Sequence, residues 1–175
     1  MDQLVLSCKK AIGWLHQNLS QYNGDPEQIY IAGHSAGGHL AAMMMATNWP
    51  EFDPSISAGT IKGICAISGL YNLLPVQLCY VNDTLKMDKE TATRNSPVQL
   101  SPHKSCPLIL AVGGEETAEY KEQSRELYDE WTAKGADAQY LEIADTNHFS
   151  VLTSLLDHSS VLHKTFFRMM NMEKS

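Results

Sequence analysis

Residues 29–45 read IYIAGHSAGGHLAAMMM, and this stretch decides which fold we expect. Its first four residues are apolar and partly β-branched, which is typical of a buried strand. Residues 40–46 are rich in good helix formers. The pentapeptide between them, Gly33-His34-Ser35-Ala36-Gly37, therefore joins a strand to a helix through a tight turn. We expect Gly33 and Gly37 to be the small residues that the close approach of the backbone in such a turn requires.

A serine at the centre of this turn has the setting of a nucleophile elbow, in which strained backbone exposes the hydroxyl. We therefore interpret Ser35 as a nucleophile rather than as a structural serine in a glycine-rich turn. The first amides of the following helix point toward the group that such a hydroxyl attacks. The backbone amide of Ala36 is accordingly predicted to be an oxyanion donor.

A serine nucleophile needs a base, which in this kind of fold comes later in the chain, in a loop after a strand. His148 has that setting, because residues 138–143 alternate like a strand and His148 lies in the loop that follows. We predict His148 as the base; the alternative is a histidine in a surface loop. The other histidines lie within the elbow, on its helix or in helical and turn-like stretches: His16, His34, His39, His103, His158 and His163.

The acid that orients the base is expected after the preceding strand. Residues 107–112 form an unbroken apolar run, typical of a strand covered on both faces, and Glu115 and Glu116 follow closely. Neighbouring side chains point in different directions, so one of the two can reach the imidazole. We favour Glu116, with Glu115 as the alternative and Asp145 as a weaker rival in the same loop as His148.

Several segments together resemble the kynurenine formamidase (arylformamidase) group of α/β-hydrolases. The elbow and its continuation to Leu40 resemble the elbow of that group. The other similar segments follow in the order of the family: 68–73, 82–85, 96–97, 112–120 with 123–124, and 147–149. The resemblance runs from about residue 10 to about 165, and it supports Glu116 over Glu115 as the acid.

The resemblance implies an α/β fold with a mainly parallel sheet and flanking helices. It also implies hydrolysis of an aryl formamide, N-formylkynurenine, to kynurenine and formate, with no metal and no cofactor. A short-chain carboxylesterase and a catalytically impaired half-domain are the alternatives. Members of the family carry a His-Gly-Gly segment before the elbow that completes the oxyanion hole, and residues 1–175 contain no such segment.

The chain therefore resembles the carboxyl-terminal part of the fold, as one domain over residues 1–175. Four strands are predicted, at 28–33, 61–68, 107–113 and 138–143. The first would have an open edge, which favours pairing with another chain, so a homo-oligomer is expected. A helix over residues 1–22 is expected to pack on the sheet through one face, formed by Leu4, Leu6, Ala11, Ile12, Trp14, Leu15 and Leu19.

Composition limits the partners. The net charge is −7 with no basic run, which argues against nucleic acid. No apolar stretch is long enough to span a membrane, and the residues after Met1 lack the basic opening of a signal peptide. We therefore expect a cytoplasmic protein that acts on a small acyl substrate.

The four cysteines are scattered, which indicates buried free thiols rather than a zinc site: Cys8, Cys65, Cys79 and Cys106.

Overall fold

A four-stranded parallel sheet forms the centre of the molecule in the computed structural model, which describes residues 1–102 and 106–172. Each strand pairs with the next in chain order, so the order across the sheet is β1-β2-β3-β4. The strands are β1 (Ile29–His34), β2 (Ile61–Ile67), β3 (Leu108–Gly113) and β4 (Ala138–Ile143). The predicted α/β architecture and the four predicted strands are confirmed, with boundaries that differ by one residue at most.

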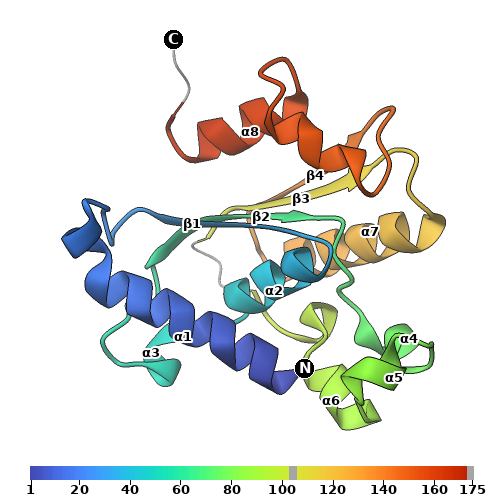
Figure 1. The fold of residues 1–175 in the computed structure, drawn as a ribbon, viewed down its shortest axis with the longest axis horizontal. Coiled ribbons are helices and arrows are strands. Elements are labelled where there is room, and N and C mark those ends of the chain that lie inside the picture. The colour runs from blue at the N-terminus through green and yellow to red at the C-terminus, as the bar shows by residue number, and fades with distance from the viewer. Residues whose placement is uncertain (103–105, 173–175) are drawn as a thin grey trace.

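Helices cover both faces of the sheet (Figure 1). On one face lie α1 (Asp2–Asn18), α2 (Ala36–Met45) and α7 (Ala118–Ala133), and on the other lies α8 (Val161–Met169). Between β2 and β3 the chain leaves the sheet in three short helices, α4 (Leu73–Gln77), α5 (Asn82–Leu85) and α6 (Lys89–Arg94). The remaining short elements are η1 (Leu19–Tyr22), α3 (Trp49–Phe52), η2 (Pro97–Gln99) and η3 (Ser150–Leu155).

The core has one cluster on each face of the sheet, because the side chains of a strand alternate between its faces. The first cluster joins the methionines of α2 to alternate residues of β2 and β3 and to Leu127 and Trp131 of α7. The second joins the other residues of these strands to Leu162 of α8. A strand buried on both sides reads as a continuous apolar run, which explains why the run at 107–112 predicted β3.

The predicted amino-terminal helix is present, but the prediction of its buried face is partly wrong. Val5 is buried, whereas Leu4 and Trp14 are each about half exposed, at 51% and 50%. The reason is that α1 lies against α2 rather than directly on the sheet. Gly13 faces the side chain of Ile56, at the turn after α3. None of the helices in the described ranges is long and apolar enough to cross a membrane.

The cysteines are free, as predicted, but two of them are not buried. Cys65 and Cys106 are buried, Cys8 is intermediate and Cys79 is exposed. Burial raises the pKa of the Cys65 and Cys106 thiols to about 12, so both stay protonated and unreactive at neutral pH. Cys79 escapes burial because it follows α4 in the excursion between β2 and β3, away from both core clusters.

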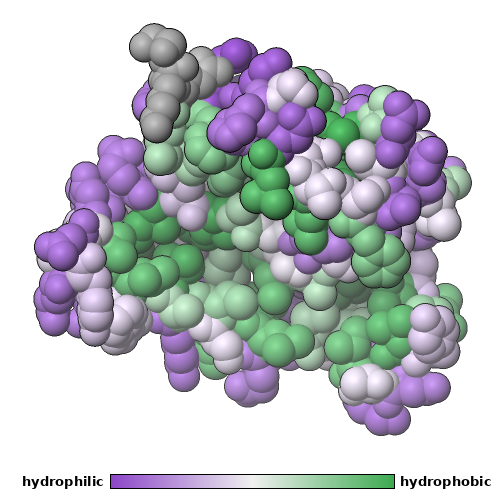
Figure 2. Space-filling view, turned by 45° about the horizontal axis from the view of Figure 1, so that its top comes forward, coloured by the Kyte–Doolittle hydropathy of each residue, from purple (hydrophilic) through white to green (hydrophobic). Residues whose placement is uncertain are grey.

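Among the described residues β1 pairs with β2 alone, so its other edge is open. Ala32 in β1 is exposed, and Ile31 is only partly covered. Figure 2 shows hydrophobic side chains gathered across the middle of one face of the molecule, surrounded by hydrophilic ones. An open, apolar strand edge is a surface on which another chain can pair.

We expect the isolated chain to self-associate through this edge, and Ala32→Lys to reduce the association, because a lysine on an edge strand opposes pairing. Sedimentation velocity over a concentration series measures the effect. Ala58→Lys is the matched control, since it adds the same charge at an exposed position outside β1. A wild-type chain that stays monomeric throughout the series would contradict the expectation.

Candidate active site

The elbow places Ser35 in a conformation that few residues adopt. Its backbone has φ 57° and ψ −118°, and it is the residue that immediately precedes α2. Two backbone hydrogen bonds hold this geometry: the amide of Ser35 donates to the carbonyl oxygen of Ile67 in β2 at 2.9 Å, and its carbonyl accepts from the amide of His39 at 3.1 Å. A positive φ in a residue other than glycine costs about 1–3 kcal/mol and is typical of functional sites.

Gly33 is required by the elbow, whereas Gly37 is not. A Cβ atom on Gly33 would lie 2.2 Å from the carbonyl oxygen of Gly37, which is rigid backbone. A Cβ on Gly37 meets nothing within 4 Å, so the prediction for Gly37 is wrong. The second close approach is at Gly38, where a Cβ would lie 2.7 Å from the carbonyl oxygen of Ile67. The neighbour that crowds α2 is therefore the end of β2.

Gly33→Ala is expected to lower the free energy of unfolding by about 3 kcal/mol or more, because the added methyl group overlaps backbone that cannot move aside. Gly37→Ala is the matched control and should leave stability unchanged or raise it by up to about 1 kcal/mol, as alanine favours helix. Urea unfolding of both variants measures the difference. Equal stabilities would show that the backbone at Gly37 can move aside to accommodate a methyl group on residue 33.

The structure brings together Ser35, His148 and Glu116. Nε2 of His148 lies 3.1 Å from the hydroxyl oxygen of Ser35, and Nδ1 lies 2.7 Å from Oε2 of Glu116. A carboxylate accepts hydrogen bonds and does not donate them. Nδ1 of His148 therefore carries the proton, which leaves Nε2 free to accept the proton of Ser35. This is the arrangement that general-base activation of a serine needs.

Glu116 is held by donors on both of its oxygens. Besides the bond from His148 to Oε2, Oε1 accepts from the backbone amide of Gly113 at 2.8 Å and from the hydroxyl of Ser68. The side chain of Glu116 is fully buried, whereas that of His148 is 22% exposed. The carboxylate is thus fixed inside the protein, and the imidazole that it orients lies at the surface, where a substrate can reach it.

The two rival carboxylates lie elsewhere. Glu115 is exposed, and its backbone amide donates to the carbonyl oxygen of Thr146 at 2.8 Å, which ties the acid loop to the histidine loop. Asp145 is exposed and has φ 57°, at the turn after β4. Neither makes a hydrogen bond to His148 among the described residues. Of the three candidates, the geometry favours Glu116.

Ala36 is the first residue of α2. Its amide is one of the four at the start of a helix that have no acceptor within the helix, so it is available to a negatively charged oxygen next to Ser35. The catalytic and oxyanion roles of these residues remain predictions, and the structure supplies the geometry that they require. His103, one of the histidines considered from the sequence, lies outside the described residues.

Three neighbours of the triad were not recognised from the sequence. Ser68 follows β2 and binds Glu116, while the rings of His34 and Tyr120 lie 4.6 and 4.5 Å from that of His148, centroid to centroid. Burial and the charge of Glu116 raise the pKa of Tyr120. Ser68 could have been found from its position, since functional residues gather at the carboxyl ends of parallel strands. His34 is the last residue of β1 and carries the same signal, whereas Tyr120 lies on α7 and does not.

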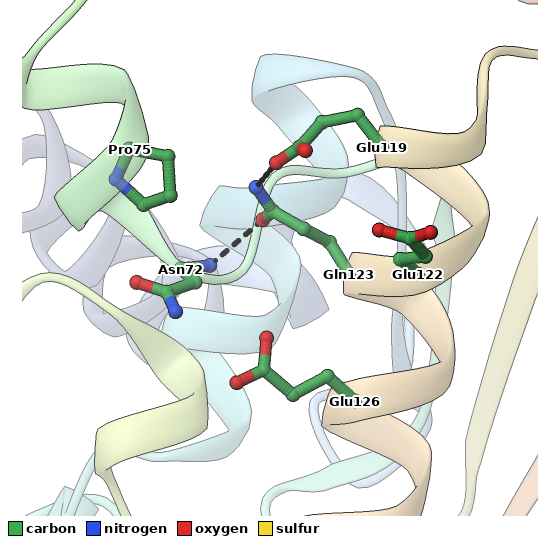
Figure 3. A pocket seen from close by; sticks show the side chains of 6 residues that line it. All are labelled: Asn72, Pro75, Glu119, Glu122, Gln123 and Glu126. Atoms are coloured by element: carbon green, nitrogen blue, oxygen red, sulfur yellow. Dashed lines mark hydrogen bonds between the residues drawn. The ribbon is translucent and has the colours of Figure 1, made fainter.

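A cavity of about 310 Å³ lies nearby, between α4 and α7 (Figure 3). Gln123 is one of its lining residues, and its side-chain oxygen accepts from the amides of Tyr71 and Asn72 at 2.7 and 2.9 Å. Its lining residues are Asn72, Pro75, Glu119, Glu122, Gln123 and Glu126. No residue of the triad lines the cavity, so it is separate from the triad.

Comparisons with known proteins identify the family and the fold. The BD-FAE family profile matches residues 3–131. Kynurenine formamidase of Danio rerio is 36% identical over 97% of this chain and 57% of its own length, and Esterase LipC of Mycobacterium tuberculosis is 25% identical over 82% and 40%. A solved acetyl ester-xyloside bifunctional hydrolase from Caldicellulosiruptor lactoaceticus superposes with a TM-score of 0.74 at 18% identity, over 97% of this chain and 66% of that one. The chain thus spans about half the length of the curated relatives that it matches.

Proposed function

The chain belongs to the BD-FAE family of α/β-hydrolases, and from this premise we propose that it is a serine hydrolase that cleaves an aryl formamide, N-formylkynurenine, into kynurenine and formate. The observation that carries the reaction type is the hydrogen-bonded series Ser35–His148–Glu116. The substrate class rests on the similarity to kynurenine formamidase.

The proposed reaction proceeds by acyl transfer through Ser35. His148 accepts the serine proton at Nε2 while the serine oxygen attacks the formyl carbon. The amide of Ala36 stabilises the oxyanion of the tetrahedral intermediate, and one such donor is worth about 3 kcal/mol. His148 then gives its proton to the departing aniline nitrogen, so kynurenine leaves. Water repeats the cycle on formyl-Ser35 and releases formate.

Glu116 stays ionised throughout, because its role is to keep the proton of His148 on Nδ1 and to stabilise the imidazolium that forms. Its burial and its three donors fix the carboxylate before substrate arrives. Such preorganisation lowers the barrier, since no group has to reorient as charge develops.

A short-chain carboxylesterase is the second candidate, favoured by the similarity to Esterase LipC. The triad does not distinguish an ester from an anilide, so the substrate pocket decides between them. We expect kcat/KM for N-formylkynurenine to exceed that for p-nitrophenyl acetate in parallel assays. A large preference for the acetate ester would reject the formamide and leave the serine hydrolase intact.

The third candidate is a catalytically impaired half-domain, since the chain spans 57% of the Danio rerio enzyme. A fluorophosphonate probe separates this candidate from the other two, because the probe reacts with an activated serine and needs no particular substrate pocket. Labelling of wild-type protein that is lost in Ser35→Ala and His148→Ala supports the hydrolase. A wild-type chain that does not react would favour the impaired half-domain.

A further inference from the structure

Two consecutive residues contact the same histidine, one at its side chain and the other at its main chain. Ser35 contacts the side chain of His148, with its hydroxyl oxygen 3.1 Å from Nε2. His34, the last residue of β1, contacts the main chain of His148, with its own Nε2 2.7 Å from the carbonyl oxygen. The side chain of His34 thus connects the elbow to the histidine loop, which lies 114 residues later in the sequence.

We propose that His34 is a positioning residue, which fixes the backbone of the catalytic base His148 relative to the nucleophile beside it. The proposal rests on the proposed function, since it gives His148 the role of base. It adds a residue to the site that no step of the reaction uses directly. It also gives a reason for a histidine within the pentapeptide at the position before the serine.

The carbonyl oxygen of His148 accepts and does not donate, so Nε2 of His34 must carry a proton. Burial lowers the pKa of His34 and the neighbouring His148 lowers it further, while the hydrogen bond to the carbonyl raises it. A neutral His34 with its proton on Nε2 satisfies the bond. Neutrality also matters because the two rings are 4.6 Å apart, and His148 becomes a cation during the reaction.

The histidine loop needs such a contact at this point. Asn147 orders the loop from within, because its side chain accepts from the amides of Phe149 and Ser150 at 2.9 and 3.0 Å. Thr146 is tied to the acid loop through its carbonyl oxygen. Neither tie involves a residue of the elbow. The hydrogen bond from His34 connects the loop to the elbow, so His148 is fixed by the residue that directly precedes the nucleophile Ser35.

Two substitutions separate the hydrogen bond from the ring. His34→Leu removes the donor, whereas His34→Gln keeps an N–H near the position of Nε2. His39→Leu is the matched control, because Nε2 of His39 also lies 2.7 Å from a backbone carbonyl oxygen, that of Asn95, and this bond does not involve the histidine loop. The melting temperature of each variant shows whether it is folded under the conditions of measurement.

The first readout is the Nδ1 proton of His148 in protein with ¹⁵N-labelled histidine, assigned by its loss in His148→Ala. This proton is protected only while the imidazole rests on Glu116, so it reports position without any turnover. We expect the signal in wild type, His34→Gln and His39→Leu, and its loss in folded His34→Leu. A signal that persists in His34→Leu, or disappears equally in folded His39→Leu, would overturn the inference.

The second readout is the rate of fluorophosphonate labelling of Ser35. A displacement of about 1 Å at a reacting group costs up to about 100-fold in rate, so His34→Leu should react about 10- to 100-fold more slowly, and His34→Gln within about threefold of wild type. An unchanged rate in His34→Leu would reject the positioning role. An unreactive wild type with the Nδ1 signal present would instead reject the proposed function, so the two failures are distinguishable.

Discussion

Replacing Ser35 by alanine is expected to lower the rate of hydrolysis by about 10⁵- to 10⁶-fold, and replacing His148 by alanine should have an effect of similar size. The two side chains form one hydrogen-bonded unit. Without the hydroxyl there is no nucleophile, and without the imidazole the hydroxyl keeps its proton at neutral pH. The double variant should be little worse than either single one, because the members of such a unit act together.

The measurement is kcat/KM on N-formylkynurenine and on p-nitrophenyl acetate, with the free energy of unfolding determined in parallel. Ser124→Ala is the matched control. The Ser124 hydroxyl is buried and, among the described residues, has no hydrogen-bond partner, so its removal should leave both activity and stability nearly unchanged. Activity of Ser35→Ala within about tenfold of wild type would contradict the mechanism, because loss of a triad serine has a much larger effect.

The strands and the members of the site were predictable from the sequence for a common reason. β3 is a continuous apolar run bounded by turn residues, and each member of the site lies in the turn or loop after a strand: Ser35 after β1, Glu116 after β3 and His148 after β4. In a parallel sheet all the carboxyl ends lie at one edge, so three residues in this position are brought close together whatever their separation along the chain. Strand recognition therefore led directly to the site.

Other features depend on contacts that local sequence does not encode. The residues alone left Glu115 and Glu116 open, and the structure separates them because the turn after β3 directs Glu116 inward, where the distant side chains of Ser68 and His148 bind it. The requirement for Gly38 rather than Gly37 depends on where β2 ends. The exposed face of α1 depends on its packing against α2. Each of these needs the position of a distant segment.

Glu116→Gln is expected to reduce kcat by about 10³- to 10⁴-fold, although glutamine has nearly the same shape as glutamate. The amide oxygen would keep the bonds from Gly113 and Ser68, which require an acceptor. The amide NH₂ would then face Nδ1 of His148, which must become an acceptor. The imidazole proton moves to Nε2, where it points at the Ser35 hydroxyl, and the histidine can no longer act as a base.

Glu115→Gln removes the same charge from the neighbouring residue and is the matched control, with activity expected within about threefold of wild type, as is usual for an exposed side chain. The Nδ1 proton signal of His148 should disappear in Glu116→Gln and remain in Glu115→Gln, which links the loss of rate to the tautomer rather than to unfolding. Equal losses of activity in the two variants would show that negative charge near the loop matters more than the hydrogen bond. A loss in Glu115→Gln alone would identify Glu115 as the acid, because the carboxylate that sets the tautomer is the one whose removal stops the base.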